Sequence, residues 1–102
     1  MTDLVHIERV EPREDYWLRL WFSDGAIKDV DMSEVIAKGP VFEPIRNSYE
    51  VFSQVRVNER TRTIEWPGEV DLDPTVLYGT FEPASGAKMR RRVIREPDPA
   101  TA

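Results

Sequence analysis

Four carboxylates form the densest group of chemically capable side chains in the sequence: Glu65, Glu69, Asp71 and Asp73. Such a group could bind a cation or provide a general acid and a general base. A calcium-binding loop, however, places oxygen ligands at regular positions and ends in a bidentate Glu, a pattern that this stretch lacks. Asp73 precedes Pro74, which is typical of a helix N-cap followed by the first helical residue. We therefore expect Asp73 to cap a helix and Asp71 to accept backbone N–H bonds in the preceding turn.

Other catalytic chemistries lack the residue types that they need. The chain has no Cys, which excludes disulfides, thiolate catalysis and Cys-based zinc sites. Its one His, His6, has no nucleophile placed beside it and is expected to be an ordinary strand residue. The five Gly residues form no phosphate-binding loop. We predict that the protein is not an enzyme and uses no cofactor or metal. The least favoured alternative is a small hydrolase or metal-dependent enzyme built on the four carboxylates.

An aromatic and basic strip is predicted on the clearest strand, residues 16–22. Its apolar residues alternate on one face: Tyr16, Leu18, Leu20 and Phe22. Trp17, Arg19 and Trp21 share the opposite face. If another element covers that face, the two Trp residues form a second core layer. If nothing covers it, Trp and Arg are the types enriched in binding hot spots, and we predict that these three residues contact a partner.

The charge of the chain is unevenly distributed. The formal net charge is −5, but residues 83–102 hold five bases and two acids, which is +3, so residues 1–82 carry −8. The five bases are Lys88, Arg90, Arg91, Arg92 and Arg95. We expect residues 83–102 to be a mobile basic tail that stays in solvent or folds back on the acidic body. The tail could also bind nucleic acid, although it has no aromatic residue to stack on bases.

Two hairpins are predicted after a first strand over residues 4–10. In the first, a three-residue loop with Gly25 in a left-handed conformation pairs Arg19 with Asp29, whereas a two-residue loop would place an acid on the core face. We therefore predict the three-residue loop. The second hairpin joins residues 55–58 to 63–66, and Trp66 is expected to anchor the core rather than stack on a ligand.

Three short helices are predicted from their capping patterns. Residues 31–34 and 47–50 both have the cap-x-x-Glu form of a capping box. Gly39-Pro40 should stop the first helix early, and the second should run over residues 48–54. The third helix is the one that begins at Asp73-Pro74, and it should direct Leu77 and Tyr78 inward.

These elements predict a single α+β domain over residues 1–82. We expect two layers, a mainly antiparallel sheet of about five strands with two or three short helices packed on one face. The N-terminal residues are too charged for a signal peptide, and no apolar run approaches the ~18 residues of a membrane span. The expected location is therefore the cytoplasm, with no membrane partner.

The order of these motifs resembles a known bacterial family. The residues that carry the resemblance are Gly39, Pro40, Phe42, Trp66, Pro67, Asp71, Asp73, Pro74, Leu77 and Tyr78. Over about residues 4–78, the chain resembles the family catalogued as domain of unknown function number 2442. The resemblance implies a compact α+β domain without an established activity. Some members are fused to a helix-turn-helix DNA-binding domain, and many are encoded beside another small protein, as in toxin–antitoxin pairs.

The favoured function is a noncatalytic protein-interaction or regulatory module. Its partner would be another small protein, and the resemblance suggests the antitoxin-like half of a two-protein pair. The alternative is a nucleic-acid-associated accessory domain that acts through its basic tail.

Overall fold

The computed structural model describes residues 5–68, 70–79 and 86–99. It shows an α+β domain, which confirms the predicted class, with seven strands that divide into two antiparallel sheets rather than one sheet of about five. The larger sheet has the order β1-β2-β3-β7, formed by Ile7–Pro12, Trp17–Phe22, Ile27–Asp31 and Arg91–Arg95. The smaller sheet has the order β4-β5-β6, formed by Arg56–Asn58, Thr63–Trp66 and Val70–Asp71. The helices are short: α1 is Glu43–Arg46, α2 is Tyr49–Phe52, α3 is Pro74–Tyr78, and two 3-10 turns are η1, Glu14–Tyr16, and η2, Pro40–Phe42.

The β2–β3 hairpin has the register that charge pairing predicts. Arg19 lies opposite Asp29, and the Phe22 N–H donates to the Ala26 carbonyl, 2.9 Å away, which closes the three-residue loop. Gly25 adopts φ +91°, the left-handed conformation that the loop requires. The same register puts Lys28 on the core-facing side, where its ammonium donates to the Tyr78 carbonyl at 2.8 Å. Burial, followed by the nearby Arg91 charge, lowers the pKa of Lys28.

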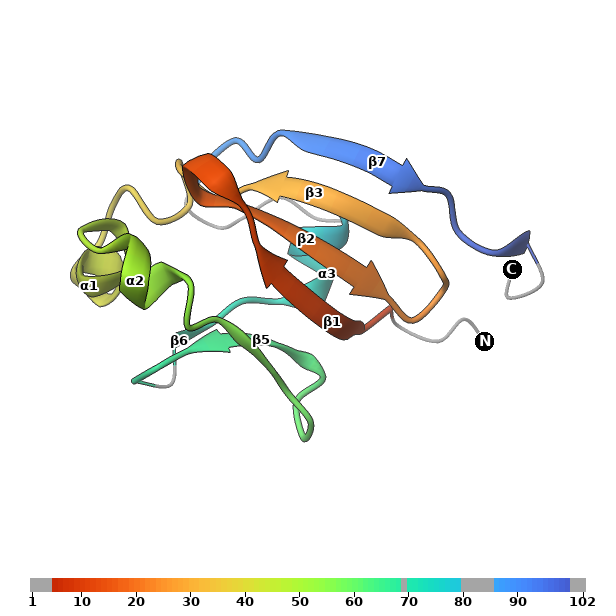
Figure 1. The fold of residues 1–102 in the computed structure, drawn as a ribbon, viewed down its shortest axis with the longest axis horizontal. Helices are drawn as coiled ribbons and strands as arrows, with labels where there is room; N and C mark the ends of the chain where they lie inside the picture. Colours follow the sequence, from red (N-terminus) through yellow and green to blue (C-terminus); the bar gives the residue numbers. More distant parts are fainter. Residues whose placement is uncertain (1–4, 69, 80–85, 100–102) are drawn as a thin grey trace.

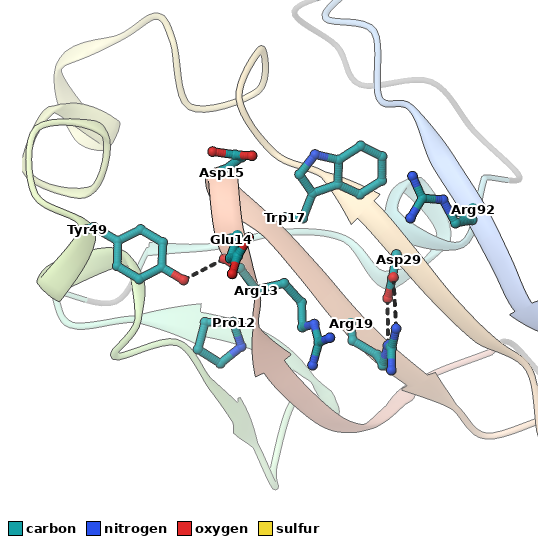
Figure 2. Close-up of a pocket in the computed structure, with 9 residues that line it drawn as sticks. All are labelled: Pro12, Arg13, Glu14, Asp15, Trp17, Arg19, Asp29, Tyr49 and Arg92. Carbon is teal, nitrogen blue, oxygen red and sulfur yellow. Dashed lines mark hydrogen bonds and ion pairs between the residues drawn. The ribbon is translucent and has the colours of Figure 1, made fainter.

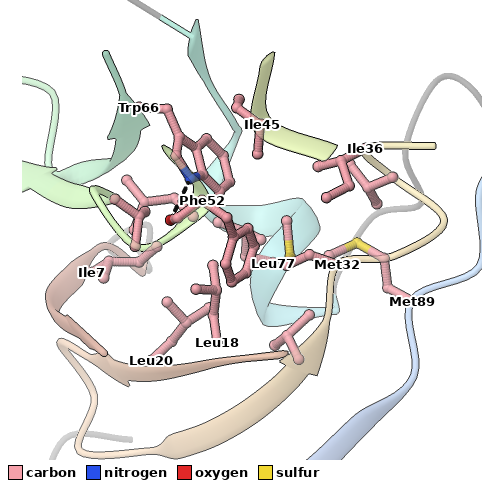
Figure 3. Close-up of a cluster of buried hydrophobic side chains, with 14 of the residues drawn as sticks. Ile7, Leu18, Leu20, Met32, Ile36, Ile45, Phe52, Trp66, Leu77 and Met89 are labelled. Atoms are coloured by element: carbon pink, nitrogen blue, oxygen red, sulfur yellow. Dashed lines mark hydrogen bonds between the residues drawn. The ribbon is translucent and has the colours of Figure 1, made fainter. Parts of the chain in front are cut away.

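The core joins the two sheets and the helices into one body (Figure 3). Leu18 and Leu20 of β2 face Leu77 of α3 and Trp66 of β5, and all four are at most 1% exposed. The Trp66 indole N–H donates to the Phe52 carbonyl at 2.9 Å, so the largest core side chain leaves no unpaired donor. A backbone hydrogen bond from Ile7 to the Arg62 carbonyl, 2.9 Å, links the edge of the larger sheet to the smaller one.

Two predicted helix starts differ from the structure. Asp31 does not cap a helix: its carboxylate accepts from the Ser33 N–H at 3.0 Å and hydroxyl at 2.7 Å, and residues 33–36 form only a turn. The Asp31 carboxylate closes this turn instead of capping a helix. In the second case Ser48, not Asn47, is the N-cap of α2, and its hydroxyl accepts from the Val51 N–H at 3.3 Å.

Part of the predicted mobile tail is a strand, β7, so of the two predicted alternatives this part folds back on the body rather than staying in solvent. Arg91–Arg95 pairs antiparallel with β3 and forms the end strand of the larger sheet (Figure 1). Met89, just before the strand, is 9% exposed and joins the core. The reason is that β3 offers a free edge, and the acidic residues Asp29 and Asp31 of β3 lie against the Arg-rich segment. Residues 83–85 of the predicted linker lie outside the described residues.

Candidate functional site

The larger sheet has an outer face, which we define as the side turned away from α3 and the core. Cross-strand pairs share a face, so the register and the contact between Arg90 and Asp31 assign its members: Arg9, Glu11, Trp17, Arg19, Trp21, Ile27, Asp29, Asp31, Arg90, Arg92 and Arg95. Trp17, Arg19 and Trp21 run along its middle strand and are half-buried. The three residues share one face of the strand, as their alternation predicts. They are neither core residues nor fully exposed.

Arginine side chains cover part of both Trp rings. The Arg9 guanidinium lies 4.6 Å from the Trp21 ring centroid, and those of Arg92 and Arg90 lie 5.3 Å and 5.9 Å from Trp17. Each such contact contributes about 0.5–1 kcal/mol when it is exposed. The half-burial of the Trp rings thus arises from charged side chains of the same sheet face, which a partner can also contact.

Carboxylates fix three of the outer-face arginines. Arg19 donates to both oxygens of Asp29, at 2.8 Å and 3.1 Å, and this hydrogen bonding raises the pKa of Arg19. Arg90 donates to Asp31 from two nitrogens, at 3.2 Å and 2.9 Å. Arg9 forms an ion pair with Glu11. Asp29 and Asp31 are 6% and 5% exposed. The bidentate Arg19–Asp29 pair and the Arg90–Asp31 pair, in which both nitrogens donate to one oxygen, therefore anchor two arginines of the outer face.

The five bases of the predicted tail separate according to strand alternation. Arg90 and Arg92 join the outer face beside Trp17. Arg91 turns inward and donates to the carbonyls of Val76, Leu77 and Met89, at 2.6 Å, 3.1 Å and 3.2 Å, and its burial lowers its pKa. Lys88 and Arg95 are exposed. The predicted nucleic-acid cluster is therefore divided between two places. Arg91 hydrogen-bonds the carbonyls at the end of α3, whereas Arg90 and Arg92 belong to the same surface as Trp17, Arg19 and Trp21, which we call the Trp strip.

An open hollow of about 640 Å³ lies at one end of the outer face (Figure 2). Its lining includes Arg13, Asp15, Trp17, Tyr49 and Arg92. Trp17 lies between the turn at Asp15 and Arg92 of β7, and the Tyr49 hydroxyl donates to the Arg13 carbonyl. The hollow thus joins the Trp strip to the β7 arginines and adds an exposed tyrosine to the surface.

Backbone strain marks the rim of this hollow. Asp15 and Tyr16 adopt φ +58° and +64°, a left-handed conformation that costs a residue with a side chain of order 1 kcal/mol or more. Tyr16 is held there because its hydroxyl donates to the Arg46 carbonyl at 3.1 Å and its ring packs 4.9 Å from that of Phe52. The polar turn was visible in the sequence, but this strain was not, because its cause is a distant contact.

The predicted carboxylate group does not assemble into one site. Asp73 accepts from the Thr75 N–H at 2.8 Å and caps α3, which has Pro74 at its start. Glu65 accepts from the Asn58 amide at 2.7 Å, and Asp71 lies across from it on β6 with an exposed side chain. Glu69 lies outside the described residues. Within the described part, no group of three or more His, Cys, Asp or Glu residues could hold a metal ion.

The remaining signature residues support the fold around the core. Gly39 has φ +89° and precedes η2, which contains Pro40 and Phe42, and Phe42 packs against the core. Trp66 and Leu77 are in the core itself. Pro67 is exposed at the end of β5, and the Tyr78 hydroxyl donates to Asp24. Burial, together with this contact, raises the pKa of Tyr78 to about 12.

Acidification is expected to remove stability through Asp31. Burial alone raises its pKa, but hydrogen bonds from Ser33 and Arg90 outweigh burial and leave the pKa below the ordinary 3.8. A carboxyl with a depressed folded pKa stabilises the fold above its unfolded pKa, and that stability is lost as the pH falls through the folded pKa. Thermal melting between about pH 5 and pH 2 should therefore fall less steeply in Asp31→Asn than in the wild type. Equal slopes of melting temperature against pH in Asp31→Asn and the wild type would contradict this. Asp71→Asn, at an exposed position, is the control and should keep the slope of the wild type.

The observed arrangement defines a small antiparallel α+β domain whose helices and second sheet cover one face of the larger sheet. In the described residues, no helix has the length and apolarity needed to cross a membrane. The chain belongs to the family of proteins of unknown function DUF2442, which it matches over residues 7–83. Strand β7 lies beyond that match, although it completes the sheet.

One solved structure is similar to this chain. It comes from Nitrosomonas europaea and is described as a "Putative DNA Binding Protein", with a TM-score of 0.58 and 28% sequence identity. The similarity covers 66% of this chain but only 43% of that one, so this chain spans less than half the length of its relative. Comparison with curated proteins finds no match.

Proposed function

We propose that this protein is a noncatalytic binding module that captures another small protein on the outer face, as the regulatory, antitoxin-like half of a two-protein pair. The observation that carries the proposal is the outer face itself, where Trp17 and Trp21 stay half-exposed among arginines that carboxylates hold in place. Trp and Arg are the residue types that dominate binding energy in protein interfaces. Because the bidentate pair with Asp29 fixes Arg19, less entropy of this side chain is lost on binding.

The charge pattern of the outer face favours a protein over a polyanion. Arg9, Arg19 and Arg90 each form an ion pair with a carboxylate of the same face. A phosphate backbone would have to compete with these carboxylates, whereas a protein surface with mixed charges can complement them. The formal net charge of −5 adds a general repulsion toward nucleic acid.

A second candidate, nucleic-acid binding, is favoured by the Nitrosomonas structure. The description of that protein and the presence of Arg92 and Arg90 beside Trp17 support a role in contacting nucleic acid. However, more than half of that protein has no counterpart here, so its DNA contacts can reside in the unmatched part. If this candidate is correct, single-stranded or duplex DNA binds the chain and the affinity falls steeply as the salt concentration rises. The Arg92→Ala substitution should then weaken DNA binding.

The test of the first candidate uses Trp17→Ala and Trp21→Ala. The protein is used as bait in extracts of its source cells, the captured partner is purified, and its affinity is measured for each variant. Each substitution should weaken binding at least about tenfold, as expected for hot-spot residues, while the free energy of unfolding changes by about 1 kcal/mol. Val41→Ala, at an apolar position that is 54% exposed and lies on η2, is the matched control and should change neither value.

The two measurements together decide the proposal. If both Trp variants bind the partner as tightly as the wild type does, the outer face is not the interface. If they lose several kcal/mol of stability instead, the two rings act as a second core layer and any loss of binding is indirect.

A further inference from the structure

Strand β7 ends the larger sheet with an unpaired edge. The strand order is β1-β2-β3-β7, and within the described residues β7 pairs only with β3. An edge strand presents a row of backbone N–H and C=O groups that another extended chain can pair with. Strand β7 carries Arg92, whose guanidinium lies 5.3 Å from the Trp17 ring centroid, so this edge is continuous with the surface proposed above.

The hydrogen-bonding pattern identifies which backbone groups face outward. The Asp31 N–H donates to the Arg90 carbonyl at 2.8 Å, and the register then pairs Arg92 with Asp29. In an antiparallel ladder, hydrogen-bonded and non-hydrogen-bonded pairs alternate. Arg90 and Arg92 therefore direct their backbone groups toward β3, whereas Arg91 and Val93 direct theirs toward the free edge.

The side chains of this edge are apolar and basic. Val93 and Ile94 are 49% and 43% exposed, and they are two of the four large hydrophobic residues that are exposed in the described part. Residues 90–96 contain four Arg and one Glu, which is a net charge of +3. Arg90 is paired with Asp31 and Arg91 is turned toward carbonyls. The exposed Arg92 and Arg95 have no carboxylate partner among the described residues.

This chemistry decides between the two kinds of strand that could add to the edge. A second copy of the chain would bring a segment of charge +3 against another of +3, and like charges on neighbouring strands are unfavourable. An acidic strand would instead place carboxylates near Arg92 and Arg95. Its alternate side chains, on the other face of the added strand, would cover Val93 if they were aliphatic.

We propose that the free edge of β7 receives an extended segment of the partner protein in which Asp or Glu alternates with aliphatic residues. The segment extends the sheet, and main-chain hydrogen bonds to Arg91 and Val93 provide much of its affinity. This inference deepens the proposed function, on which it rests for the statement that the partner is a protein. It assigns the edge rather than the Trp strip to recognition of the partner's backbone.

The test measures binding of a short fluorescent peptide of alternating Glu and Val to the full chain. A peptide of alternating Lys and Val is the charge control and should not bind. Binding of the Glu-Val peptide should shift the NMR signals of the Arg91 and Val93 amides. Val93→Pro removes an outward N–H that β3 does not use, so it should weaken binding about tenfold, whereas Val93→Ala should retain most of it.

The alternative outcomes each overturn the proposal. The first is no binding of the Glu-Val peptide at millimolar concentration, and the second is a Val93→Pro variant that binds the peptide as tightly as the wild type does. The third is self-association of the protein that Val93→Pro abolishes, which would make a second copy the occupant of the edge. If Val93→Pro does not fold, Arg92→Glu decides, because it should transfer preference to the Lys-Val peptide. The Trp17→Ala variant keeps the edge intact and should still bind the peptide, so failure of the Trp strip is distinguishable from failure of the edge.

Discussion

A chain that ends at Gly86 is expected to lose a large part of its stability. Such a chain lacks β7, and with it Met89, which is 9% exposed in the core. Removal of a buried Met side chain alone costs about 2–5 kcal/mol. The Val76 and Leu77 carbonyls also lose the Arg91 guanidinium, and the buried Asp31 carboxylate loses Arg90. We expect a total loss of at least about 4 kcal/mol from a stability of roughly 5–15 kcal/mol.

Thermal or urea unfolding measures this loss, and a longer truncation is its control. A chain that ends at Glu96 keeps all of β7 and gives up the backbone bond from Asp98 to the Asp24 carbonyl, 2.7 Å. It should lose no more than about 1 kcal/mol. If the chain that ends at Gly86 melts within a few degrees of the wild type, residues 87–102 contribute nothing to the fold, as expected for a mobile tail.

Strand β7 is an element of the fold that the sequence did not predict. Arg91–Arg95 is short, basic and preceded by Pro83–Gly86, a composition that favours a tail. Its partner strand β3 lies far away in the sequence, as the separation of 59 residues between Asp31 and Arg90 shows. No local pattern encodes such a pairing, since β-strand propensity depends on its neighbours. The family match also ends at residue 83, before β7.

Local chemistry, by contrast, predicted the hairpin and the third helix. The Arg19–Asp29 pair and the loop glycine fix the register within fifteen residues of chain, so the sequence contains all that is needed. Asp73-Pro74 encodes its own helix start in the same way. The turn after Asp31 differs because its buried neighbours, Met32 and Ile36, pack into the core whether or not a helix forms.

For the candidate site, alternation predicted the Trp strip but not its surroundings. Trp17, Arg19 and Trp21 share a face because a strand has a period of two. That Arg90 and Arg92 lie beside Trp17 depends on the long-range pairing of β7. Two residues of the basic segment, Arg90 and Arg92, therefore share one surface with the strip, whereas Arg91 turns inward.

The second large effect is expected at Trp66. Its side chain is 1% exposed, packs 6.0 Å from the Phe52 ring, and donates to the Phe52 carbonyl. Trp66→Ala should cost about 3–5 kcal/mol for the lost packing, and about 1–3 kcal/mol more where the buried carbonyl loses its donor. Trp17→Ala and Trp21→Ala, whose rings are half-buried, should each cost about 1 kcal/mol.

Trp66→Phe separates the two contributions to that loss. It keeps a ring in the core and removes the indole N–H, so it should lie between the wild type and Trp66→Ala in urea unfolding. Fluorescence of a Trp17→Phe, Trp21→Phe double variant reports Trp66 alone, and its emission should be that of a buried indole which shifts to the red on unfolding. If Trp66→Ala lowers the free energy of unfolding no more than Trp17→Ala does, the core does not need the Trp66 side chain. The family signature around residue 66 would then serve binding rather than folding.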